Sequence, residues 1–249
     1  MSVPSLPDQN LMNALSGDIR LLGNLLGRVI REQHGEEAFN LVEEVRLTAK
    51  ARRGGNDEAT ARLITLISGL DQDAQRILVK AFTLYFQLIN IAEDQQRIRV
   101  LRQREAADTE PVSIRRAVLA LQQTGIDAPA MRELLNKVRV RLVMTAHPTE
   151  SKRKEVLVKL RHIAGMIERR DRRNLLSREQ AALETALLEV IEGMWQTRIS
   201  RASVATVADE VDYGLYFLTN TIMDVTGDIY LQLEQALREA ADAVEARER

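Results

Sequence analysis

The residues best suited to chemistry lie in one short stretch, Thr145-Ala146-His147-Pro148-Thr149. Histidine titrates near neutral pH and is a common proton-transfer group. Pro148 disfavours helical geometry at His147, and its missing N–H suits the first turn of a helix. The stretch therefore predicts a histidine presented in a turn between an extended segment and a helix.

A basic segment follows this turn. From Glu150 to Arg178 there are ten Lys or Arg and four Asp or Glu, a net charge of +6, whereas the whole chain has a net charge of −1. The first cations fall at the predicted helix start, where the macrodipole favours anions. We interpret Arg153, within two helical turns of His147, as the residue that faces an anionic substrate. The alternative, a solvated helix face, is favoured for Lys159, Arg161 and Arg169–Arg173.

Other reactive groups are weaker candidates. His34 precedes Gly35 and is interpreted as a solvated helix cap, and His162 as a surface or core residue of the helix after the turn. No spacing of His, Asp and Glu indicates a metal site. The chain has no phosphate-binding loop and no glycine-rich dinucleotide motif.

One strand and one helix must position His147. Val138 to Met144 alternates apolar residues with arginine, which predicts a strand at about 138–145, the only convincing strand in the sequence. An amphipathic helix then runs to about Asn174. Ser177 and Gln180 match a capping box for the helix after it.

Elsewhere the apolar spacing predicts helices with few breaks. A first helix ends at His34 before Gly35, which suits a helix-ending glycine, and Asp71 or Asp73 caps a long helix that runs to about Ala107. The remaining predicted helices cover 36–53, 58–67, 113–122, 127–137, 209–223 and 225 onward. The apolar stripe of the helix after Asp73 is predicted to include Ile77, Val79, Phe82, Tyr85, Phe86, Leu88, Ile89, Ile91, Ile98 and Leu101.

Composition narrows the class of protein. Hydrophobic residues make up 45% and charged residues 29%, which fits a packed core. The net charge near zero and 4% aromatic content argue against a nucleic-acid module, even one that uses Arg169–Arg173. The chain has no cysteine, so disulfides and thiolate metal sites are excluded. No apolar run reaches the length of a membrane span, and the N-terminus does not resemble a secretory signal.

The stretch Thr145-Ala146-His147-Pro148-Thr149-Glu150, with Arg153 and Lys154, resembles the catalytic-histidine motif of phosphoenolpyruvate carboxylase. Two looser similarities to the same family lie at Asp18–Arg31 and Phe86–Arg99. The chain departs from the family pattern between Arg198 and Glu210, where Ala205-Thr206 precedes Asp209-Glu210 and a proline is expected. These similarities extend over most of the chain.

The resemblance implies a mainly α fold: the helical N-terminal part of a carboxylase-type α/β barrel. Residues 1–137 would be the N-terminal helical region, and residues 138–249 would begin the catalytic barrel with its first strand, the His147 turn and the following helices. It implies a lyase that joins bicarbonate to phosphoenolpyruvate, through carboxyphosphate and the enolate of pyruvate, to give oxaloacetate and phosphate. His147 would be catalytic and Arg153 substrate-binding.

The family also implies Mg²⁺ or Mn²⁺, a homotetramer, a cytoplasmic location and a role in carbon dioxide fixation and the tricarboxylic acid cycle. Its metal ligands and arginine-rich loop have no counterpart here, so we interpret the chain as an N-terminal segment or truncated copy. Because one strand cannot close a barrel, the chain alone is predicted to be inactive. The alternative is a non-catalytic helical interaction protein derived from that fold.

Overall fold

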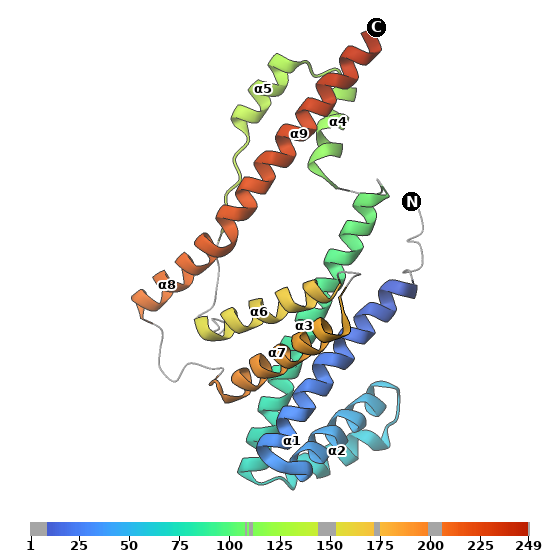
Figure 1. Ribbon diagram of the computed structural model, residues 1–249, viewed down its shortest axis with the longest axis vertical. Helices are drawn as coiled ribbons and strands as arrows, with labels where there is room; N and C mark the ends of the chain where they lie inside the picture. Colours follow the sequence, from blue (N-terminus) through green and yellow to red (C-terminus); the bar gives the residue numbers. More distant parts are fainter. Residues whose placement is uncertain are drawn as a thin grey trace. The chain divides into compact units, whose positions relative to one another are not determined.

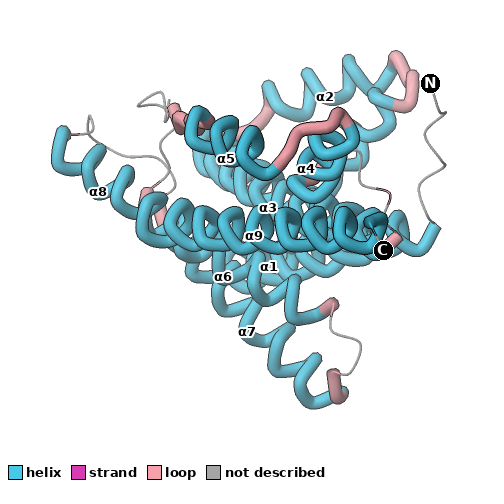
Figure 2. Tube along the Cα trace, turned by 90° about the horizontal axis from the view of Figure 1, so that it is seen from above, coloured by secondary structure: helices cyan, strands magenta, loops and turns pink. Residues whose placement is uncertain are grey.

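A computed structural model of the protein describes residues 9–107, 109, 112–143, 153–171, 175–198 and 206–248 (Figure 1). The described residues form helices and loops only, as Figure 2 shows. The mainly α prediction is confirmed for them. The helices are α1 (Gln9–Arg53), α2 (Glu58–Ser68), α3 (Gln72–Ala106), α4 (Ile114–Gln123), α5 (Ala128–Lys137), α6 (Lys154–Arg170), α7 (Ser177–Gln196), α8 (Val207–Phe217), the π-turn η1 (Leu218–Ile222) and α9 (Met223–Glu248).

Most helix boundaries follow the predicted caps. Gly35 breaks α1 into two helices, with φ 84° and ψ 175°, a conformation that glycine adopts without strain. The Asp71 carboxylate accepts a hydrogen bond of 2.8 Å from the backbone N–H of Ala74, so Asp71 caps α3. The capping-box prediction at Ser177 is wrong by one residue. Leu176 is the N-cap, and its N–H donates to the Glu179 carboxylate at 2.9 Å.

The predicted strand is not present in the part of it that the structure describes. Residues 138–143 form an irregular segment, although the backbone of Val138 is extended. Val140 is 84% exposed and Val143 is 74% exposed. A strand requires a second strand to pair its N–H and C=O groups, and no other described segment supplies one. The α/β barrel therefore stays a prediction.

The C-terminal helices also differ from the prediction. A break near Asp224 was expected, but α8, η1 and α9 follow one another without a loop. Instead of a loop, the π-turn η1 connects α8 to α9. The Asn220 amide of η1 donates to the Tyr216 carbonyl of α8 at 2.8 Å.

The chain divides into two compact units. Unit 1 comprises Met1–Arg102 and Glu155–Ser200, and unit 2 comprises Gln103–Lys154 and Arg201–Arg249. The predicted boundary between residues 137 and 138 concerns the complete fold and stays a prediction.

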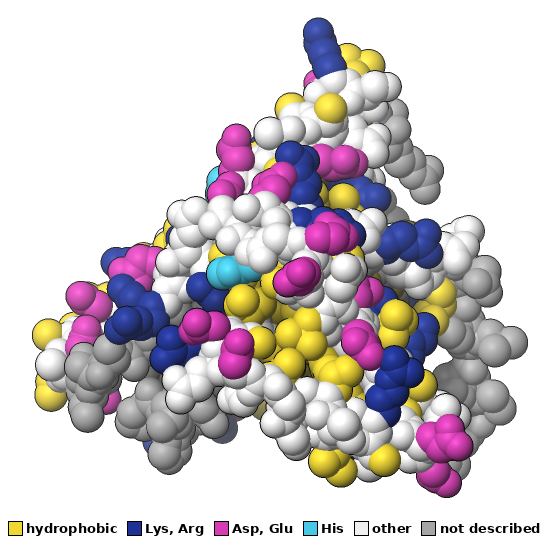
Figure 3. All heavy atoms as spheres, turned by 90° about the horizontal axis from the view of Figure 1, so that it is seen from below, with side chains coloured by type: hydrophobic (Ala, Val, Ile, Leu, Met, Phe, Trp, Pro, Cys, Tyr) yellow, Lys and Arg dark blue, Asp and Glu magenta, His cyan; other side chains and the backbone are white. Residues whose placement is uncertain are grey.

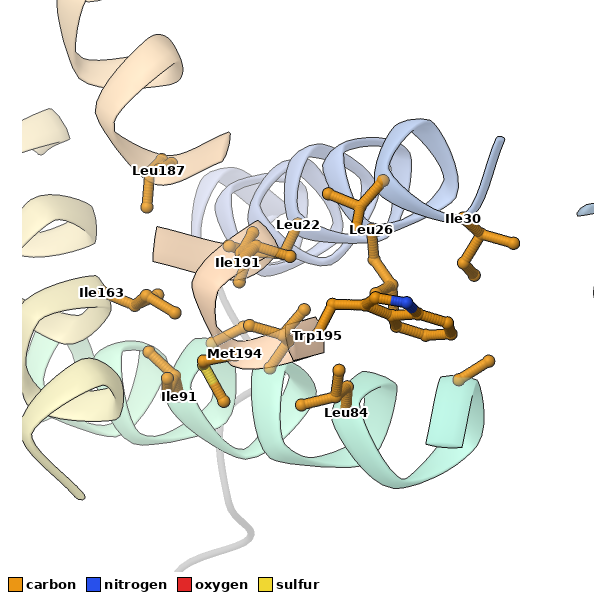
Figure 4. Close-up of a cluster of buried hydrophobic side chains, with 14 of the residues drawn as sticks. Leu22, Leu26, Ile30, Leu84, Ile91, Ile163, Leu187, Ile191, Met194 and Trp195 are labelled. Carbon is orange, nitrogen blue, oxygen red and sulfur yellow. The ribbon is translucent and has the colours of Figure 1, made fainter. Parts of the chain in front are cut away.

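Unit 1 contains a large apolar core. Side chains from α1, α3, α6 and α7 point toward one another in it (Figure 4). Its members include Leu22, Leu26 and Ile30 of α1, Leu84 and Ile91 of α3, Ile163 of α6, and Leu187, Ile191, Met194 and Trp195 of α7. Each fully buried Leu or Ile contributes about 1.5–3 kcal/mol relative to an exposed one, so this core, which also includes Leu63 of α2, holds the helices of unit 1 together.

The apolar stripe predicted for α3 is divided between two faces of that helix. Of its members, Leu88 and Ile91 are buried in the core, whereas Val79 is 67% exposed and Phe86 is 55% exposed. Leu84, which the prediction did not include, is also buried in the core. A helix with apolar residues on two faces can bury only one of them against a single core. The second face, with Phe82 and Phe86, is therefore left partly open.

Unit 2 has a small core where α4 and α5 meet α9, made by Val118, Met131, Ala236 and Ala240. Many apolar residues of α8 and α9 are exposed.

On the face of the molecule in Figure 3, apolar side chains form a patch with basic and acidic groups around it. No helix among the described residues is long and apolar enough to cross a membrane.

Candidate functional site

The two predicted site residues are placed differently by the structure. His147 lies outside the described residues, so its catalytic role and its position at a strand tip stay predictions. Arg153 is half-buried and directly precedes α6. Lys154 is exposed in the first turn of α6, where Glu155 is the acidic residue that suits the macrodipole.

The helix that follows the motif is held firmly along its length. Val156, Ile163 and Ile167 of α6 are at most 2% exposed and belong to the core of unit 1. The ammonium group of Lys159 donates to the Gly193 carbonyl at 2.9 Å and to the Thr197 hydroxyl at 2.6 Å. Lys159 therefore satisfies a carbonyl at the end of α7, and its assignment to a solvated face was wrong.

A partly buried polar cluster fixes the other end of α6. We call it the Asp18 network; it consists of Asp18, Gln95, Arg99, Arg170 and Asp171. The Asp18 carboxylate accepts from Arg99 at 2.6 Å and from Arg170 at 2.7 Å. The Asp171 carboxylate accepts from Arg99 at 2.7 and 2.9 Å and from Gln95 at 2.8 Å. The network joins α1, α3 and the end of α6.

Burial and charge act against each other in this network. The side chain of Asp18 is 3% exposed and that of Arg99 is 12% exposed. Burial by itself would raise the pKa of Asp171, but hydrogen bonds from Arg99 and Gln95 outweigh it and the pKa is lowered. Burial likewise opposes ionisation of Arg99, and the two carboxylates raise its pKa overall. Arg99 and Asp171 are therefore held as a pair of ions.

The network accounts for part of the basic charge after His147. Arg170 was predicted to lie on a solvated face, but it binds a carboxylate from α1, more than 150 residues away in the sequence. Arg161 and Arg169 are exposed, as predicted. The two looser family-like segments meet here, since Asp18 belongs to one and Arg99 to the other. Asp18 and Arg99 lie within two separate helices, and no neighbouring residue indicates that the two side chains meet. The sequence therefore did not reveal this ion pair.

The other two histidines, His34 and His162, both lie within the described residues. His34 is exposed, and its Nε2 accepts a hydrogen bond of 3.1 Å from the indole N–H of Trp195. It is therefore more than a solvated cap, because it holds α7 against α1. His162 is exposed on α6, as one of its two predicted positions.

The departure from the family pattern near residue 206 keeps a regular helix start. The Thr206 hydroxyl accepts from the Asp209 N–H at 3.3 Å, and the Asp209 carboxylate accepts from the Thr206 N–H at 2.9 Å. This reciprocal pair is a capping box at the start of α8. Thr206 thus starts the helix in a segment where the family pattern has a proline.

A metal site would require several oxygen or imidazole ligands directed at one point. Among the described residues, no group of three or more His, Asp or Glu side chains could hold an ion. Asp18 and Asp171 are bound to guanidinium groups instead. The described residues therefore do not fit the divalent metal that the resemblance implies.

The family model of phosphoenolpyruvate carboxylase matches residues 15–249. The chain belongs to the phosphoenolpyruvate carboxylase family. It is 40% identical over 230 residues to a phosphoenolpyruvate carboxylase of Roseiflexus castenholzii. It is 37% identical to those of Rhodopseudomonas palustris, over 233 residues, and Thermus thermophilus, over 227 residues.

These alignments cover 90%, 92% and 90% of the chain, but 24%, 25% and 25% of the relatives. The chain therefore spans about a quarter of the length of the curated phosphoenolpyruvate carboxylases it matches. The match includes the Asp18 network and the His147 motif, so both lie in family-related sequence.

Proposed function

We propose that this chain supplies the His147 segment of a phosphoenolpyruvate carboxylase active site, in an enzyme that converts phosphoenolpyruvate and bicarbonate to oxaloacetate and phosphate. The observation that carries the proposal is the unbroken motif from Thr145 to Lys154 within a chain of this family. The cytoplasmic location, the tetramer and the tricarboxylic acid cycle stay predictions of the same resemblance.

The chemistry assigned to this chain involves two side chains. Bicarbonate attacks the phosphorus of phosphoenolpyruvate, the enolate of pyruvate leaves, and the enolate then attacks carbon dioxide released from carboxyphosphate. His147 handles the proton that bicarbonate brings, a task that suits an imidazole near neutral pH. Arg153 binds the phosphate, because a guanidinium forms paired charge-assisted hydrogen bonds with phosphate oxygens. The divalent metal that would stabilise the enolate has no ligand cluster among the described residues.

The structure supports a positioning role for α6. This helix directly follows Arg153 and is fixed by the apolar core, by Lys159 and by the Asp18 network. A catalytic group must be held within a fraction of an ångström of its working position. A helix anchored at its middle and its end provides such a support for the chain segment that enters it.

The purified 249-residue chain tests the first part of the proposal. We expect no oxaloacetate formation in an assay coupled to malate dehydrogenase. Turnover that His147→Ala abolishes would contradict the prediction that this chain is inactive alone.

A chimera tests the second part. The matching quarter of the Thermus thermophilus relative is replaced by this chain. We expect oxaloacetate formation, and we expect His147→Asn to lower kcat by about 10²–10⁴-fold, the usual contribution of a general acid or base. Arg153→Gln is expected to raise KM for phosphoenolpyruvate. His162→Asn, an exposed histidine on α6, is the matched control and should leave both constants unchanged.

The chimera also distinguishes the proposed carboxylase function from the alternative, a non-catalytic interaction protein. If it folds, as judged by its melting temperature, but forms no oxaloacetate, a non-catalytic helical interaction protein becomes the better description. Equal activity of His147→Asn and the unmodified chimera would remove His147 from the mechanism.

A further inference from the structure

A groove lies between α1 and α3 in unit 1, away from the His147 motif in sequence. Two adjoining hollows with volumes of about 450 and 730 Å³ form it, and they share Ile19, Arg46, Phe82 and Tyr85. Binding sites for small molecules commonly have volumes of roughly 300–1,000 Å³. We call this feature the α1–α3 groove; its lining includes Arg20, Phe39, Arg46, Arg53, Phe82 and Phe86.

Aromatic rings are concentrated in the groove. Phe39, Phe82 and Phe86 are three of the four phenylalanines in the chain. The rings of Phe82 and Phe86 are 6.2 Å apart, and that of Tyr85 lies 6.1 Å from that of Phe86. Phe86 is 55% exposed although it lies on a helix with a large buried face. Exposed ring faces of this kind stack with flat apolar or heteroaromatic molecules.

Cations line the same groove. Arg46 is paired with Glu43 at 2.7 Å, and the Arg31 guanidinium lies 3.4 Å from the Phe39 ring centroid and 3.2 Å from Glu36. Within the described part of the chain, four further lining cations have no carboxylate partner: Arg20, Lys50, Arg52 and Arg53. The dipole at the end of α1 accounts for the last three. It does not account for Arg20, which lies in the middle of the first half of α1.

We propose that the α1–α3 groove binds a small molecule that carries both a flat ring and a phosphate group. The rings provide stacking surfaces, and the guanidinium groups provide hydrogen-bond donors in the planar arrangement that phosphate accepts. The two features occur on facing helices of one unit, so neither depends on the arrangement of the two units. The site is separate from the carboxylase activity proposed above.

The test uses isothermal titration calorimetry of the full chain with adenosine monophosphate, adenosine and inorganic phosphate at low ionic strength. If both features act, adenosine monophosphate binds at least about tenfold more tightly than either part, a difference of about 1.4 kcal/mol. Added salt should weaken binding of the phosphate-bearing probe, because screening weakens exposed charge pairs.

Two variants test the groove itself. Arg20→Gln combined with Arg53→Gln is expected to reduce the affinity to that of adenosine, and Phe86→Ala to that of phosphate. These side chains are exposed, so the fold should be retained, which Trp195 fluorescence can verify. Arg97→Gln is the matched control, since Arg97 is exposed on α3, outside the groove, and has no ion-pair partner among the described residues.

Each other outcome overturns the proposal. Absence of saturable binding at millimolar adenosine monophosphate would remove the site. Phosphate binding as tightly as adenosine monophosphate would show that the rings have no role. Unchanged affinity in the groove variants, or equal loss in Arg97→Gln, would place binding elsewhere on the chain.

Discussion

In unit 1, Val29, Ile163 and Leu187 are fully buried, whereas in unit 2 Val207 is 78% exposed and Leu231 is 65% exposed. Unit 1 packs apolar side chains from five helices, α1, α2, α3, α6 and α7, into one core and adds the Asp18 network at one end of α6. The core of unit 2 has four buried residues, two of them alanines. The stabilising free energy increases with the apolar area that is buried. The described residues of unit 2 therefore gain much less stability from apolar burial than those of unit 1.

The difference in apolar burial indicates that the helices of the two units are stabilised in different ways. Helices of unit 1 are fixed by tertiary contacts. Those of unit 2 depend more on local features, such as the capping box at Thr206 and the ion pair within α9 between Arg238 and Glu234 at 2.6 Å. Local features contribute about 1 kcal/mol each or less. Unit 2 should therefore open at lower free energy than unit 1.

The largest expected effect comes from the buried carboxylate of unit 1. Asp18→Ala leaves Arg99 and Arg170 without one partner, and breaking a buried ion pair in this way costs about 3–5 kcal/mol. Urea unfolding followed by Trp195, the single tryptophan and a buried residue of unit 1, measures the loss.

Asp73→Ala serves as the control for Asp18→Ala. Asp73 forms an ion pair with Arg76 and its side chain is 87% exposed, so its removal should change stability by no more than about 0.5 kcal/mol. Similar losses in the two variants would mean that the Asp18 network adds nothing to unit 1.

A second pair of variants compares the apolar parts of the two units. Leu187→Ala removes a fully buried side chain of unit 1 and should cost about 2–5 kcal/mol. Leu231→Ala in α9 removes an exposed one and should cost about 0.5 kcal/mol or less. Circular dichroism follows both units and Trp195 fluorescence follows unit 1. A larger loss from Leu231→Ala would show that the Leu231 side chain is packed in solution.

The smallest effect concerns acid pH. The pKa of Asp171 is lowered in the folded chain, so the unfolded chain binds more protons there and stability rises with pH. This contribution is complete above the unfolded pKa of about 3.9 and is lost as pH falls through the folded pKa. The stability difference between the parent chain and Asp171→Asn should therefore narrow below about pH 4.

Glu239 of unit 2 gives the comparison for that experiment. Hydrogen bonds from Arg115 and Gln235 lower its pKa, and the side chain of Arg115 is 49% exposed, whereas that of Arg99, the partner of Asp171, is 12% exposed. Salt screens exposed charges far more than buried ones. The pH dependence removed by Glu239→Gln should disappear at high salt, while that removed by Asp171→Asn should persist. Equal salt sensitivity would contradict the difference between the units.

Local sequence features predicted the helices well, because their signals are local. Gly35 and Asp71 mark helix ends through their own backbone conformation or side-chain hydrogen bonds. The predictions failed where the local structure depends on residues that are distant in the sequence. The strand at 138–145 depends on a second strand, and the apolar stripe of α3 depends on which of its faces meets the core.

The sequence by itself determined the helical class, the positions of most helices and the family, because a motif such as Thr145–Lys154 and a helix cap are read from neighbouring residues. Only the tertiary structure decided that Asp18 meets Arg99 and Arg170, that Lys159 binds the end of α7, and that Phe86 lines a groove. The physical reason is that a contact between residues far apart in the chain depends on how whole helices pack. Helix packing is decided by the summed fit of many side chains, and no short stretch of sequence contains that sum.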